Sequence, residues 1–129
     1  MNEAGKKSSD DVTIVYKVTA AGSAVQETMF PGAPHEMVTI YHLDGDQLVL
    51  THYCAGGNQP RMKLLDAGAK DSKVLAFRFA GGTNMKETDP HMDAARLTLV
   101  DAEHLQEVWS SVKDGKPAEE AIFDLTRKK

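Results

Sequence analysis

His52 and Cys54 are the residues of this chain whose types and spacing most directly suggest chemistry. Side chains two residues apart on a β-strand point to the same face, so an imidazole and a thiol would stand together there. Such groups are ligands for zinc or iron, and a cysteine beside a histidine can become a nucleophile when its thiolate is stabilised. The structural alternative is that Cys54 is a small buried apolar residue and His52 a hydrogen-bonded wall residue.

The next group on this face depends on the turn at Asp44-Gly45, the strongest hairpin dipeptide in the chain. A two-residue loop would bring one set of alternating residues to the face: His35, Met37, Thr39 and Tyr41. A three-residue loop with a bulge would instead bring the other set: Glu36, Val38, Ile40 and His42. We favour the second arrangement, because it joins the apolar residues of the two strands, Leu48 and Leu50 among them, in one stripe.

Two further side chains are expected near the same end of the sheet. Arg61 follows the strand that ends at Cys54 and would anchor a carboxylate or another oxyanion. His91 lies in an expected long loop over residues 80–93, and long loops in compact β domains often bind ligands. The predicted ligand-binding residues are therefore Glu36, His42, Leu50, His52, Arg61 and His91.

Other familiar catalytic motifs are missing from the sequence. The chain contains no Gly-x-Ser-x-Gly elbow, and the pairs Gly56-Gly57 and Gly81-Gly82 lack the Lys-Ser/Thr of a phosphate-binding loop. His42 follows His35-Glu36 at a spacing of seven residues, which differs from the spacing of a zinc-protease helix motif. The glycine pairs are therefore interpreted as loop residues.

The composition describes an ordinary globular domain. The chain has 129 residues, 41% of them hydrophobic and 26% charged, with a formal net charge of -4. No apolar run approaches the roughly 20 residues that cross a bilayer, so no membrane span is expected. Scattered basic residues and a net negative charge argue against nucleic-acid binding. A single cysteine excludes an internal disulfide and suits a cytoplasmic protein as well as a secreted one from which the signal segment is gone.

Alternating apolar and polar residues predict strands along most of the chain. Residues 1–11 lack such a pattern and are expected to be a disordered tail, while residues 12–129 form one β-barrel domain. Residues 105–112 also fit helical spacing and residues 117–121 could form one helical turn, but strand is favoured for the first. The expected strands cover residues 12–19, 24–30, 36–43, 46–54, 61–65, 73–79, 96–100, 105–112 and 119–127.

About nine strands in succession, joined by short turns, predict an all-β fold with an up-and-down antiparallel sheet. A sheet of this size is expected to close or curl into a lipocalin-like barrel, because closure hides its edges.

Several segments carry a resemblance to a known group of proteins. They are the stretch from His35 to His42, the stretch from Thr51 to Cys54, residues 58–62, and the ending from Asp114 to Arg127. With the order of elements, they resemble bacterial proteins of uncharacterised function that look like small calycin (lipocalin-like) barrels. The resemblance covers nearly everything from Val12 onward and implies a fold rather than an activity. Lipocalins typically open with a Gly-x-Trp strand, whereas here no Trp precedes Val12.

Two functions are compatible with these observations. The favoured one is binding of a small apolar or amphipathic molecule in the barrel lumen, which requires no cofactor. The alternative is a small hydrolase of esters or lactones, with His52 as general base and Cys54, an activated water or a bound metal completing the site. In both cases the expected partner is a small molecule.

Overall fold

The computed structural model describes residues 6–7, 13–65 and 73–127 of the chain. Most of the expected tail over residues 1–11 lies outside this part. Lys6–Lys7 form a short strand, β1, that lies parallel to β10. In the described residues, no helix is long and apolar enough to span a membrane.

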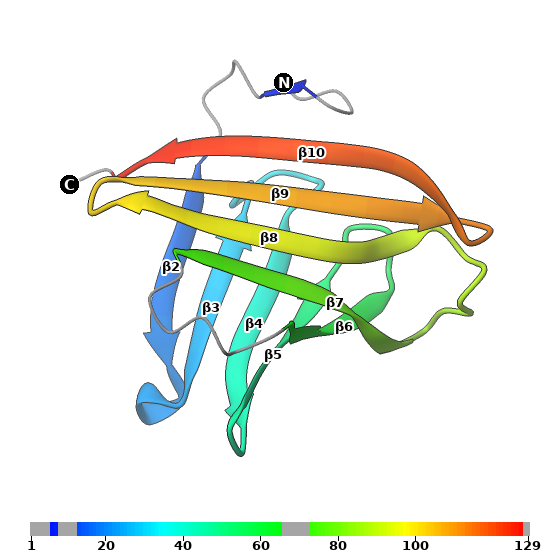
Figure 1. Ribbon diagram of the computed structural model, residues 1–129, viewed down its shortest axis with the longest axis horizontal. Coiled ribbons are helices and arrows are strands. Elements are labelled where there is room, and N and C mark those ends of the chain that lie inside the picture. Colours follow the sequence, from blue (N-terminus) through cyan, green and yellow to red (C-terminus); the bar gives the residue numbers. More distant parts are fainter. Residues whose placement is uncertain (1–5, 8–12, 66–72, 128–129) are drawn as a thin grey trace.

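The remaining strands form the predicted all-β, up-and-down antiparallel sheet of nine strands, which curls through 235° into a half-barrel (Figure 1). Each strand pairs with the next along the chain, and the long strands β8 to β10 cross over the half made by β2 to β5. The curled shape is consistent with a lipocalin-like fold. The strands are β2 (Ile14–Thr19), β3 (Ala24–Met29), β4 (Met37–Asp44), β5 (Gln47–Tyr53), β6 (Gln59–Leu64), β7 (Val74–Thr83), β8 (His91–Asp101), β9 (His104–Lys113) and β10 (Lys116–Thr126).

Tight turns set the strand register where glycine permits a left-handed backbone. Between β9 and β10, Lys113 pairs with Lys116, and the two residues between them, Asp114 and Gly115, have φ of 54° and 76°. Positive φ at both central residues is typical of a type I′ hairpin turn, which Asp-Gly favours. The dipeptide therefore sets the pairing of β9 with β10 at the turn, and the register shifts once further along, between Pro117 and Glu120.

The favoured register of the β4–β5 hairpin was wrong. Asp44 pairs with Gln47, so the loop has two residues, and Thr39 lies opposite His52. The concave face consequently carries Thr39 and Tyr41, while Glu36 and His42 are exposed. The interior of this sheet accepts polar groups, and the apolar Val38 and Ile40 lie half-buried on the other face.

The expected loop over residues 80–93 is also shorter than predicted. β7 continues to Thr83, and β8 begins already at His91. Gly81 and Gly82 belong to β7, so the interpretation of this pair as loop residues was wrong. A β-carbon at Gly82 would come within 2.5 Å of the Met85 sulfur and 3.1 Å of the Gln59 carbonyl oxygen. A glycine in a strand often marks such a close approach of other chain atoms. Residues 105–112 lie within β9, which confirms strand over helix there, and residues 117–121 lie within β10 rather than in a helical turn.

The hydrophobic core lies on the concave face and fills the inside of the half-barrel. It consists of Met29, Tyr41, Leu50, Met62, Phe77, Ala95, Leu97, Trp109 and Phe123. The Tyr41 and Phe77 rings meet edge-on at 6.0 Å, which joins β4 to β7 across the interior. Phe30, just after β3, meets Phe123 of β10 at the same distance. Among the described residues, side chains therefore connect the two ends of the sheet.

We expect far-ultraviolet circular dichroism to report mainly strand. The only helical element among the described residues is the short 3-10 turn η1 (Ala20–Gly22). A measured helix content above about one third, the average for globular proteins, would contradict the fold.

Candidate functional site

Six polar or amphipathic residues form a continuous set inside the half-barrel, which we call the buried polar belt: Glu27, Thr39, Tyr41, His52, Glu107 and Trp109. Strand pairing places Glu27 opposite Thr39, and Thr39 opposite His52, so three of them form a row over β3, β4 and β5. The His52 ring packs against Trp109 of β9, with 4.7 Å between the ring centroids. The belt therefore crosses the interior from one wall to the other.

Glu27 is fully buried, and two tyrosine hydroxyl groups donate to its carboxylate. Tyr41 donates to Oε1 at 2.5 Å, and Tyr16 donates to Oε2 at 3.3 Å. Burial raises the pKa of Glu27 to about 7, although the hydrogen bond from Tyr41 acts in the opposite direction. Burial, with the charge of Glu27, also raises the pKa of Tyr41. Each carboxylate oxygen of Glu27 therefore already accepts a hydrogen bond from a side chain of the protein.

His52 has only one of its ring nitrogens hydrogen-bonded. Its Nδ1 lies 2.8 Å from the Thr39 hydroxyl oxygen, whereas its Nε2 is buried without a partner. The side chain is 1% exposed, and this burial lowers the pKa of His52 to about 4. At neutral pH the imidazole is therefore uncharged, and Nε2 is its one ring nitrogen without a hydrogen bond.

Glu107 repeats this pattern on the opposite wall. Its Oε1 accepts a hydrogen bond from the Trp109 indole N–H at 2.9 Å, while its Oε2 is buried without a partner. Burial raises the pKa of Glu107 to about 7, against the smaller effect of the Trp109 hydrogen bond. Trp109 thus contacts the two residues of the belt, His52 and Glu107, that hold an unpartnered polar atom.

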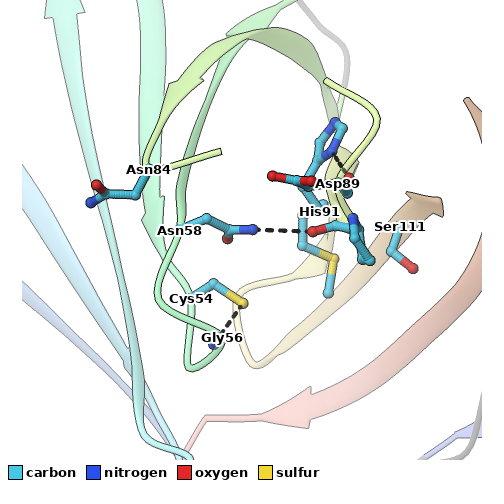
Figure 2. A pocket seen from close by; sticks show the side chains of 9 residues that line it. Cys54, Gly56, Asn58, Asn84, Asp89, His91 and Ser111 are labelled. Carbon is cyan, nitrogen blue, oxygen red and sulfur yellow. Dashed lines mark hydrogen bonds between the residues drawn. The ribbon is translucent and has the colours of Figure 1, made fainter. Parts of the chain in front are cut away.

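A pocket of about 470 Å³, which we call the end pocket, opens at one end of the half-barrel (Figure 2). It lies where the β5–β6 loop faces the loop before β8. Its lining combines a thiol, amide, carboxylate, imidazole and hydroxyl group with apolar surface: Cys54, Gly56, Asn58, Asn84, Asp89, Pro90, His91, Met92 and Ser111.

Hydrogen bonds hold the polar groups of the end pocket in place (Figure 2). The Asn58 amide N–H donates to the Pro90 carbonyl at 3.1 Å, which ties the two loops together, while Asn58 Oδ1 is buried without a partner. His91 Nδ1 lies 2.7 Å from the Asp89 carbonyl oxygen, which can only accept, so Nδ1 carries the proton. The Cys54 sulfur accepts from the Gly56 amide at 3.5 Å.

The end pocket lies next to the buried polar belt. Cys54 follows His52 by two residues, and Ser111 follows Trp109 by two residues on β9. Two residues of a strand span about 7 Å and return to the same face. Along β9, Trp109 is therefore the next residue inward from Ser111 on the same face, and His52 packs against Trp109.

The structure brings together only some of the residues predicted for binding. His52 and Leu50 are buried on the concave face, and His91 lines the end pocket together with Cys54. Glu36 is exposed and accepts from the Gly32 amide at 3.0 Å. His42 and Arg61 are likewise exposed, with Arg61 alternating with the inward-facing Pro60 and Met62 of β6.

Sequence reasoning missed Glu27 and Glu107, although a signal was present. Glu27 shares one face of its strand with Val25 and Met29, and Glu107 shares one face with Leu105 and Trp109. A carboxylate within an apolar stripe is unusual, because an ionised group is costly to bury.

In this geometry, His52 and Cys54 are not hydrogen-bonded to each other as a cysteine hydrolase would require, since each has another partner. His52 Nδ1 is bonded to Thr39, and the Cys54 sulfur to the Gly56 amide. Within the described ranges, no three residues among His, Cys, Asp and Glu are grouped so that they could hold a metal ion.

Comparison with known proteins finds no family model, no curated protein and no solved structure that matches this chain. The fold and the site define the class as an all-β half-barrel with a polar belt inside and a pocket at one end.

Proposed function

We propose that the protein binds a small amphipathic molecule that enters the end pocket and extends toward the buried polar belt. The single observation that carries this proposal is the end pocket itself, which lies next to the buried polar belt and has the unpartnered Asn58 Oδ1 in its wall. Small-molecule sites typically combine apolar walls with a few convergent polar groups that fix orientation.

The polar atoms without partners support the same proposal. A buried acceptor left unpaired costs about 1–3 kcal/mol, so a ligand that donates to Asn58 Oδ1 or engages His52 Nε2 gains binding energy from it. Met92 and Pro90 supply apolar contact for the rest of the molecule. Methionine side chains adapt their shape easily to different ligands.

Filling the end pocket tests this function. Ser111→Phe places a ring at the pocket wall and is expected to weaken binding of the neutral fluorescent probe N-phenyl-1-naphthylamine by at least about tenfold. Probe fluorescence titrated with wild type and variant measures this change.

Ser110→Phe is the matched control, because Ser110 neighbours Ser111 on β9 but does not line the pocket. It is expected to leave probe affinity near that of the wild type, with circular dichroism confirming that both variants fold. Equal probe binding by wild type and a folded Ser111→Phe protein would remove the end pocket as the binding site.

A further inference from the structure

Charge is distributed unevenly between the inside and the outside of the half-barrel. Every Lys and Arg side chain within the described residues 13–65 and 73–127 is exposed. Glu27 and Glu107, in contrast, are both fully buried on the concave face. In the described part of the chain, the interior therefore holds acidic groups with no Lys or Arg side chain beside them.

Two atoms of the belt identify where a ligand would be held. Glu107 Oε2 and His52 Nε2 are each buried without a hydrogen-bond partner, and each residue contacts Trp109. Glu27 differs, because both of its carboxylate oxygens already accept hydrogen bonds from tyrosines. The free hydrogen-bonding capacity is thus concentrated around Trp109.

We infer that the part of the ligand that reaches the buried polar belt is an organic ammonium group, held by Glu107, His52 and the indole face of Trp109. This inference rests on the proposed binding function and specifies the class of ligand, a small amine with an apolar tail. The tail extends outward into the end pocket.

The chemistry of the three side chains is complementary to an ammonium group. An ammonium carries several N–H donors, which match the free Oε2 of Glu107 and the lone pair of His52 Nε2. With Nε2 as acceptor, Nδ1 carries the ring proton and donates to the Thr39 hydroxyl oxygen. The uncharged imidazole does not repel a cation. A cation within about 6 Å of an indole ring face is also attracted by the ring.

Other ligand classes fit these groups less well. A carboxylate would meet the two buried acids and find no cation to pair with among the described interior residues. A metal ion would need a larger set of ligands than the described residues group together. A neutral alcohol would form the hydrogen bonds but gain nothing from the charge of Glu107.

Head-group comparison tests the inference directly. Hexylamine, hexan-1-ol and hexanoate each have six carbons and differ in the head group, which is positive, neutral and negative respectively. Trp109 is the single tryptophan of the chain, so its fluorescence reports binding at the belt without interference. At pH 7.5 we expect hexylamine to bind at least about tenfold more tightly than the other two, because charge-assisted hydrogen bonds are the stronger ones.

Glu107→Gln keeps the shape of the side chain and an oxygen for the Trp109 N–H, but removes the charge. It is expected to abolish the preference for hexylamine, whereas Glu120→Gln, an exposed change on β10, is expected to retain it. In wild type the affinity for hexylamine is expected to rise between pH 6 and 8 as Glu107 ionises, with Glu27, Tyr41 and His52 as the other titratable groups of the buried polar belt. A merely structural role of Glu107 would not produce that pH profile.

The outcomes separate this inference from the proposed function. Equal affinities, tighter binding of hexanoate, or an amine preference that survives in Glu107→Gln would each overturn the inference. If N-phenyl-1-naphthylamine still binds in those cases, the binding function stands. If neither the probe nor the three hexyl compounds bind, both the inference and the proposed function are wrong.

Discussion

Glu107→Gln is expected to raise the free energy of unfolding at pH 8 by about 3 kcal/mol, while changing it little at pH 4.5. Burial raises the pKa of Glu107 from 4.5 to about 7, so the folded protein keeps a proton that the unfolded chain loses at lower pH. Stability is therefore lost progressively as the pH rises from 4.5 to 7, and the loss is complete above that range. Glutamine resembles the protonated acid and avoids this loss.

The wild-type profile follows from three buried groups. Glu27, with its pKa near 7, acts in the same direction as Glu107. His52 acts oppositely, because its lowered pKa makes the fold lose stability as the pH falls from 6.5 to 4. Two carboxyl groups outweigh one imidazole, so stability is expected to fall from pH 5 to pH 8.

Urea unfolding at pH 4.5 and pH 8 measures both effects, with Glu120→Gln as the exposed control. A Glu107→Gln protein that is equally stabilised or destabilised at the two pH values would show that Glu107 keeps an ordinary pKa in the folded protein.

Strand order could be predicted from this sequence because each strand carries local alternation and most turns carry Gly or Asp. The β9–β10 turn needs positive φ at Asp114 and Gly115, and the Asp-Gly dipeptide itself indicates such a turn. The first predicted strand, over residues 12–19, was placed correctly from its alternation and corresponds to β2 at Ile14–Thr19.

The register of β4 against β5 could not be settled in the same way. Two loop lengths at Asp44-Gly45 are both compatible with local rules, and they put opposite sets of residues inside. The choice depends on the polar partners that the neighbouring strands β3 and β5 offer to the residues of β4. Tyr41 can be buried because its hydroxyl donates to Glu27, and Thr39 can be buried because its hydroxyl is hydrogen-bonded to His52. Neither partner can be recognised from the sequence of β4 alone.

The candidate site was predictable only in part for a related reason. The types and spacing of His52 and Cys54 predicted a site there. Cys54 lines the end pocket, and His52 is buried two residues before it. Glu107 meets His52 only through Trp109, across the interior from β9 to β5. A contact between strands so far apart in the sequence depends on how tightly the sheet curls, which alternation does not specify.

Trp109→Ala is expected to lower the free energy of unfolding by about 3–5 kcal/mol, the usual cost of truncating a buried aromatic side chain. The side chain is 2% exposed and packs against His52, so its removal leaves a cavity in the centre of the core. It also leaves Glu107 Oε1 without the indole donor, so the whole carboxyl group loses its hydrogen bonds.

Trp109→Phe separates these two contributions. Phenylalanine keeps an aromatic ring against His52 but has no N–H, so the expected loss is smaller, with about 1–3 kcal/mol of it from the unpaired acceptor. In a Glu107→Gln background at pH 8, Trp109→Phe should cost less than in wild type, because the acceptor left unpaired no longer carries a charge. Both variants lack the only tryptophan, so urea unfolding followed by circular dichroism is the measurement. If Trp109→Ala costs no more than Trp109→Phe, the indole does not fill the interior, and the buried contact between β5 and β9 on which the belt depends would be wrong.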